Sequence, residues 1–104
     1  MTTELIQYLR RDGHPFGCMV AQKIDCDDGA VVQIGWSLCN KKDLFRKAQA
    51  RRIARGRAIG REQATKVPQE VIRSLREEMA FFSLRALKFF EAVVVKIPGS
   101  IISD

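Results

Sequence analysis

The residues that decide the fold read VVQIGWSLC and span Val31–Cys39. Hydrophobic side chains occupy every second position, at Val32, Ile34, Trp36 and Leu38, and the positions between them are glycine or polar from Gln33 to Ser37. Successive side chains of a β-strand point to opposite faces, so this alternation predicts a strand with one face buried.

The residues before this strand indicate a β-meander. Phe16–Ile24 is rich in residues that suit a strand, and Asp25–Gly29 has the composition of a turn. Phe16–Ile24 is therefore expected to pair with Val31–Cys39 as a hairpin. Glu4–Arg11 suits either a short helix or a strand, and the turn-like Asp12–Pro15 after it favours a first meander strand.

The hydrophobic period changes after this strand. Asn40 followed by Asp43 resembles a capping box, and the apolar spacing then predicts a helix from Asn40 to about Arg61. Gly56 and Gly60 lie inside it, where they indicate either close approach of another backbone or simple tolerance near a helix end.

A second helix is predicted to begin at Pro68 and end near Phe90. Its apolar residues recur at alternating spacings of three and four and form a buried seam. The seam residues are Ile72, Leu75, Met79, Phe82, Ala86 and Phe89. Phe81 and Phe90 lie beside the seam and would extend it into a subunit interface. The β-branched stretch Glu91–Ile97 predicts a final strand. The expectation is therefore one α+β domain over residues 1–104: an N-terminal antiparallel meander, two helices and a short C-terminal strand.

Composition excludes several classes. The 104 residues are 46% hydrophobic and 29% charged, which rules out a wholly disordered or collagen-like chain. No apolar run is long enough to cross a membrane and no secretion signal opens the chain, so a cytoplasmic protein is expected. The three cysteines lack metal-site spacing, and neither a metal nor a cofactor is expected.

Positive charge is concentrated in one segment. Lys41–Arg61 holds nine basic residues and one acid, whereas the rest of the chain is nearly neutral. Six of the nine are arginines, whose planar guanidinium groups match phosphate oxygens, so the segment predicts an anionic partner. The arginines spread around the predicted helix axis, so some of them are expected to reach inward or across an interface, where an anion is the natural partner. The alternative is a solvated face whose arginines pair with Glu62, Glu77 or Glu78.

Catalytic chemistry has few candidates, and we expect no enzyme. Cys39 and His14 are far apart in sequence, and Glu77 and Glu78 are helix neighbours that point in different directions. No residue is therefore assigned a catalytic role.

The stretch Ile34–Ala58 contains IGWSLCNKKDLFRK followed by RRIARGRA. It resembles the anti-Thoeris sponge family of small phage and prophage proteins, in which a strand ending in Gly-Trp/Phe-Ser-x-Cys-Asn-Pro/Lys-Lys-Asp-x-Phe precedes a helix ending in Ile-Ala-x-Gly-Arg-Ala. The resemblance implies a protein that sequesters a cyclic ADP-ribose signal of a bacterial immune system without degrading it. It also implies dimers or larger oligomers with the ligand at a subunit interface, and in some relatives cyclic oligonucleotides at separate sites.

The resemblance implies particular ligand contacts on the matching residues. Asn40 would supply polar recognition, and Arg57 would bind the pyrophosphate. Supporting roles would fall to Lys42, Asp43 and Arg51, and a further contact to Arg73 on the second helix. Phe45 or Trp36 would stack on adenine, although Trp36 fits better as a core residue. On this interpretation, Arg57→Ala abolishes capture and leaves the melting temperature nearly unchanged.

Two other binding functions fit the charge pattern. The basic helix suits a nucleic-acid groove, and it also suits an acidic host protein, with the Phe-rich second helix as the contact. Duplex binding depends steeply on salt, whereas binding of a ligand with two phosphates depends on it far less.

Overall fold

The computed structural model describes residues 4–26, 29–39, 44–59, 66–67, 69–96 and 102–103. Three strands follow one another as an antiparallel meander: β1 (Glu4–Arg11), β2 (His14–Cys26) and β3 (Gly29–Leu38). Strand β5 (Val94–Lys96) adds to β3 in parallel and completes a four-stranded sheet of order β1-β2-β3-β5. The predicted α+β class and N-terminal meander are confirmed, and Glu4–Arg11 is a strand.

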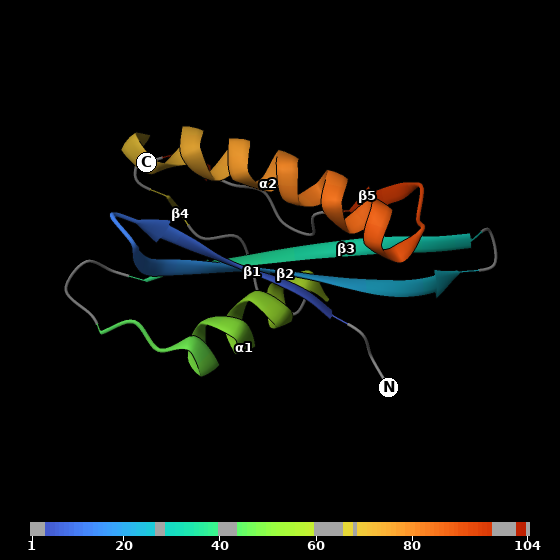
Figure 1. Cartoon of the computed structure of the whole chain (residues 1–104), viewed down its shortest axis with the longest axis horizontal. Coiled ribbons are helices and arrows are strands. Elements are labelled where there is room, and N and C mark those ends of the chain that lie inside the picture. The colour runs from blue at the N-terminus through green and yellow to red at the C-terminus, as the bar shows by residue number, and fades with distance from the viewer. Residues whose placement is uncertain are drawn as a thin grey trace.

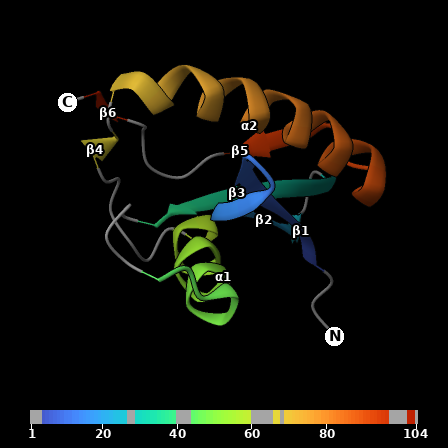
Figure 2. The same ribbon diagram turned by 60° about the vertical axis from the view of Figure 1, so that its left-hand side comes forward.

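The two helices cover opposite faces of this sheet. Figures 1 and 2 show α1 (Lys47–Ala58) on one side of the strands and α2 (Gln69–Phe90) on the other. A second, two-stranded parallel sheet joins β4 (Lys66–Val67) to β6 (Ile102–Ser103), which the sequence did not predict. No helix among the described ranges has both the length and the apolar character needed to cross a membrane.

Tight turns set the register of the meander. Asp12 and Gly13 connect β1 to β2 with φ angles of 51° and 80°, and positive values at both central residues define the turn that best matches strand twist. At the next corner, Cys26 is the partner of Gly29, so the strands extend into most of the predicted turn Asp25–Gly29.

The face of the sheet toward α2 carries the larger core. Every second residue of β3 points into it, and Trp36 is 4% exposed, so its predicted place in the core is confirmed. The helix contributes its predicted seam with one correction: Phe89 is 54% exposed and Phe90 is 7% exposed. The last turns of the helix bury residues 82, 86 and 90, because a period of 3.6 favours a spacing of four there.

The face toward α1 is packed by small residues. Ala50, Ala54 and Ala58 recur every four residues along α1 and are buried. They allow the helix backbone to come so close to β3 that a Cβ atom built on Gly35 would lie 1.9 Å from the Ala54 carbonyl oxygen. The close backbone approach seen here is thus at a strand glycine, while Gly60, one of the two predicted candidates, lies outside the described residues.

The first helix begins later than predicted. It starts at Lys47 and ends at Ala58, while Asn40, the expected N-cap, lies outside the described residues. Arg46 is the N-cap and has an extended backbone. The ring of Phe45 packs edge-on against Tyr8 of β1 at 6.2 Å between centroids. Phe45 is thus held against the sheet, and the chain is still extended at Arg46, where the sequence predicts helix.

Strand β5 begins later than predicted. Glu91 adopts a positive φ of 52°, and Ala92 donates its amide to the Leu87 carbonyl oxygen, so the residues after α2 are needed to end the helix and reverse the chain. Glu91, Ala92 and Val93 are therefore not part of the strand, and Val94–Lys96 pairs with Val31–Gln33. Ile97 lies outside the described residues.

Candidate ligand-binding site

A cavity lies where the end of β3 meets the start of α1. Its volume is about 530 Å³, which is within the range of small-molecule sites. The lining residues come from the end of β3, the chain just before α1 and the first two turns of α1: Ser37, Leu38, Cys39, Leu44, Phe45, Arg46, Gln49, Ala50 and Ile53. Figure 2 shows α1 beneath the sheet.

Packing between α1 and β3 holds the walls in place. The Ser37 hydroxyl is buried and donates to the Ala50 carbonyl oxygen at 2.9 Å, which ties the helix to the strand. Ala50 also belongs to the small core beneath the sheet, together with Cys18 and Val20. Burial raises the pKa of the Cys18 thiol to about 11, so this cysteine is an inert core residue at neutral pH. The cavity therefore borders a small packed core that holds α1 against β3.

The start of α1 presents positive charge to this cavity. The helix has five basic residues and no acid, and no described side chain caps its first amides. Arg46 occupies the N-cap position, lines the cavity and is exposed. Unpaired amides at a helix N-terminus carry partial positive charge, and a cation there is unfavourable unless an anion accompanies it. The arrangement suits a phosphate group.

Other α1 cations are directed toward the sheet. Arg55 bonds to Glu4 of β1, and the Lys47 ammonium lies 5.1 Å from the centre of the Tyr8 ring. Arg51 is half-buried on the same helix. The expectation that basic side chains turn inward is confirmed for Arg55. Glu77 and Glu78, two of the suggested acidic partners of these arginines, lie on α2 across the sheet, so pairing of the α1 arginines with them is wrong. Glu62, the third suggested partner, lies outside the described residues.

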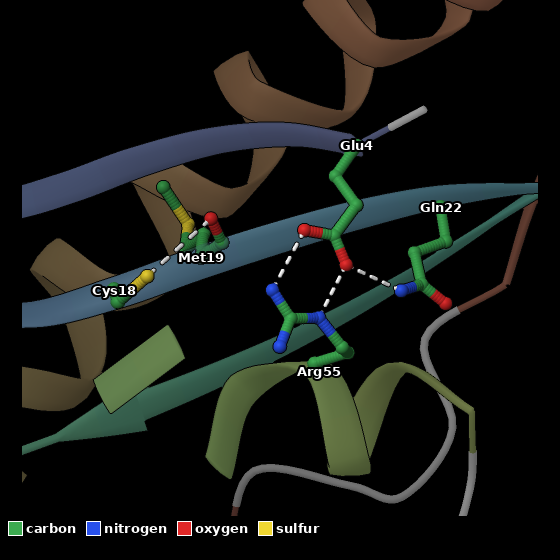
Figure 3. Close-up of polar contacts among 5 residues, drawn as sticks. All are labelled: Glu4, Cys18, Met19, Gln22 and Arg55. Carbon is green, nitrogen blue, oxygen red and sulfur yellow. Dashed lines mark hydrogen bonds and ion pairs between the residues drawn. The ribbon is translucent and has the colours of Figure 1, made fainter. Parts of the chain in front are cut away.

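Glu4 is the centre of a polar group between β1, β2 and α1 (Figure 3). Its carboxylate accepts hydrogen bonds from Nε and Nη2 of Arg55, the second at 2.9 Å, and from the Gln22 amide at 2.6 Å. The bond from Arg55 lowers the pKa of Glu4, although burial partly opposes that shift. The same bond raises the pKa of Arg55. The group anchors α1 to the first strand.

This lowered pKa predicts a pH-dependent stability. Glu4 releases its proton more readily in the folded state, so its contribution is complete above the ordinary pKa of 4.5 and is lost as the pH falls through the folded value. We expect the free energy of unfolding to fall more steeply between about pH 5.5 and pH 3 in the wild type than in Glu4→Gln. Urea titrations at several pH values measure both slopes, and equal slopes would contradict the prediction.

Arg57 lies at the open edge of β3. The Cys39 amide donates to the Phe16 carbonyl oxygen, so by alternation the Trp36 carbonyl points away from β2. Beyond Gln33 no described strand covers that edge. The Arg57 guanidinium instead donates to the Trp36 carbonyl oxygen at 2.8 Å and lies 4.8 Å from the centre of its ring. Arg57 thus supports the fold as well as carrying charge.

These contacts change the expected effect of Arg57→Ala on stability. Losing the hydrogen bond and the cation–π contact to Trp36 costs about 1–2 kcal/mol. For a domain of this size we expect the melting temperature to fall by roughly 4–15 °C. Thermal unfolding followed by circular dichroism measures the change, and Arg52→Ala, on the exposed side of α1, is the control. A melting temperature unchanged in both variants would show that the Trp36 contact contributes nothing.

The other residues implied by the resemblance are scattered. Phe45 lines the cavity, whereas Arg51 and Arg57 are farther along α1 and are not among the residues that line it. Arg73 lies on α2 across the sheet, is 90% exposed and pairs with Glu77 at 3.4 Å. Asn40, Lys42 and Asp43 lie outside the described residues, between Cys39 and Leu44, which both line the cavity. One chain therefore does not bring Arg73 together with Phe45 at the cavity.

Two polar residues of the cavity were not predicted as site residues. In the sequence, Arg46 is one of many basic residues of its segment, and no pattern distinguishes Gln49. Their importance depends on where α1 begins, because the first turn of a helix carries the free amides. A prediction that placed the N-cap at Arg46 would have put both residues in the first turn of the helix.

A second cavity, of about 440 Å³, lies between β1 and α2. Arg10 and Arg11 line it, but the Arg11 guanidinium lies 5.1 Å from the centre of the Phe16 ring, and Arg10 donates to the Gly13 carbonyl oxygen. Glu78 adds a carboxylate to the same lining. The mixed charge makes this cavity a weaker anion site than the one at α1.

Groups for metal or acid–base chemistry do not gather in the described part of the chain. No cluster of three or more His, Cys, Asp or Glu side chains that could hold a metal occurs among the described residues. His14 is exposed and is the first residue of β2. Comparison with known proteins finds no matching family model, no similar curated protein and no similar solved structure.

Proposed function

We propose that this protein captures a small phosphate-bearing nucleotide of the cyclic ADP-ribose type and holds it without cleaving it. The observation that carries the proposal is a cavity at the start of a helix with five cations and no acid. A pyrophosphate placed against the first amides of α1 and Arg46 neutralises charges that otherwise oppose each other there. Capture requires affinity and no general base.

The remaining lining suits the other parts of such a ligand. Phe45 offers an aromatic surface for a base, and Gln49 provides a donor and an acceptor for its polar edge. Asn40, Lys42 and Asp43, as the resemblance implies, would add contacts from the segment before α1. Arg51 and Arg57 would act through their charge, since they lie farther along the helix.

We infer that the ligand lies between subunits, as the resemblance implies. Leu44 lines the cavity and is 80% exposed, so a second chain that covered it would bury an apolar side chain and enclose the ligand. The proposed setting is the cytoplasm of a bacterium that carries the phage, where the signal is made. Ligand-dependent assembly, measured by light scattering, tests this point separately from binding.

Calorimetric titration tests the function directly. Cyclic ADP-ribose isomers, linear ADP-ribose and a short DNA duplex are titrated at about 50 mM and 200 mM salt. We expect one cyclic isomer to bind in the nanomolar range, near −12 kcal/mol, with little dependence on salt. The ligand recovered after heat denaturation should be intact.

Each other outcome identifies a different function. Tight duplex binding that weakens by orders of magnitude at the higher salt would support a nucleic-acid protein, which the exposed Arg46 and Arg52 also favour. An altered ligand would show an enzyme. No binding of any nucleotide would overturn the proposal.

A further inference from the structure

The outer surface of α2 carries two large apolar side chains that the fold does not use. Phe81 is 67% exposed and Leu84 is 65% exposed, although both lie in the middle of a 22-residue helix. The inner surface of the same helix is buried against the sheet through Leu75, Met79 and Phe82. Figure 1 shows α2 lying along one side of the sheet, so the far side of the helix faces away from the strands.

Charged residues flank this apolar pair on the same helical line. Glu77 lies four residues before Phe81, and Lys88 lies four residues after Leu84. Spacings of three and four place side chains above one another on one face, so the four residues form a continuous stripe. Ala80 is exposed beside it and leaves room for a neighbouring side chain. In chain order, the stripe consists of an acid, two apolar residues and a base.

We propose that two copies of this chain pair through antiparallel α2 helices, with a two-fold axis between Phe81 and Leu84. Residues at equal distances from such an axis face each other. Phe81 then meets the partner's Leu84, and Glu77 meets the partner's Lys88, once on each side of the axis. Both apolar side chains are covered, and both ends gain an ion pair.

The order of charges selects this orientation. A parallel pair in register would bring Glu77 against the partner's Glu77 and Lys88 against the partner's Lys88, and like charges repel. The ion pair between Arg73 and Glu77 is exposed, with 3.4 Å between Nε and Oε1. Breaking it so that Glu77 can pair with Lys88 of the partner subunit therefore costs little free energy. The antiparallel pair is the one in which every member of the stripe finds a complementary group.

This contact is separate from the ligand site. Helix α2 and the cavity at α1 lie on opposite faces of the sheet, so pairing through α2 leaves Phe45 and Arg46 accessible. The surface is a single helix face, which favours moderate affinity, on the order of 1–100 μM. The pairing is expected in the ligand-free protein and is independent of whether the proposed ligand binds.

Charge exchange tests the pairing. Sedimentation equilibrium of the full chain without ligand measures the dimer dissociation constant from about 1 to 500 μM. Glu77→Lys and Lys88→Glu should each weaken dimerisation at least about tenfold by creating like-charge pairs. The double variant restores opposite charges and should return to within about threefold of the wild type.

Two further variants complete the test. Phe81→Glu should abolish pairing, and Arg76→Glu, which changes an exposed α2 residue off the stripe, should leave it unchanged. Circular dichroism confirms folding, which exposed positions allow. A monomer at every concentration would overturn the proposal. So would a dimer dissociation constant that Phe81→Glu does not change, or a double variant that dimerises as weakly as the two single variants.

Discussion

Gly35→Ala is expected to unfold most of the protein or to lower its free energy of unfolding by at least about 4 kcal/mol. The added Cβ would lie 1.9 Å from the Ala54 carbonyl oxygen and 2.3 Å from the Ala58 amide nitrogen. Both are backbone atoms of α1, so no side-chain rotation relieves the overlap. The helix must move away from β3 as a unit.

Such a movement would affect several contacts at once. The Ser37 hydroxyl bond to Ala50 would lengthen, and the buried alanine face of α1 would separate from Cys18 and Val20. Because a domain of this size has only about 5–15 kcal/mol of stability, this loss is a large fraction of the total.

Urea unfolding followed by circular dichroism measures the change. Gln33→Ala is the control, since it lies on the same face of β3, is half-buried and shortens a side chain without creating an overlap. We expect it to cost less than about 1 kcal/mol. If Gly35→Ala unfolds at the same urea concentration as the control, α1 does not approach β3 as closely as the structure shows.

Arg46→Glu is expected to weaken capture of the cyclic nucleotide by at least about 100-fold, equivalent to about 2.7 kcal/mol. The change removes a guanidinium that lines the cavity and places a carboxylate where a phosphate is proposed to bind. Stability should change little, because Arg46 is exposed and an acid at the start of a helix is favourable.

Arg52→Glu supplies the matched control for this effect. It produces the same change of net charge on the same helix, and Arg52 is exposed and absent from the cavity lining. We expect a reduction in affinity of less than about fivefold, from the long-range field alone. Equal losses in the two variants, measured by calorimetry, would show a diffuse attraction along α1 and would contradict a localised site.

Patterns with a local cause were readable in the sequence. The alternation in Val31–Cys39 predicts a strand because side-chain direction in a strand depends only on position along it. The seam of α2 was predicted for the same reason, and five of its six residues are buried. The prediction that Phe89 is buried was wrong, because at the end of the helix a spacing of three or four positions fits the pattern equally well.

Helix boundaries depended on contacts that are distant in sequence. The start of α1 was misplaced because Asn40 and Asp43 provide a local capping signal, whereas the packing of Phe45 on Tyr8 involves residues 37 positions apart. The same error hid Arg46 and Gln49 as cavity residues. Glu91 in the left-handed region ended α2 without the glycine that usually marks such a position.

The sequence by itself determined the α+β class, the meander and the concentration of positive charge in one segment, because periodicity and net charge are properties of neighbouring residues. The tertiary structure alone decided that α1 rests on Gly35, that Arg57 covers the edge of β3, and that Arg73 lies across the sheet from the cavity. These features depend on which face of the sheet each helix occupies. That choice is made by packing between residues far apart in the chain, which no local pattern records.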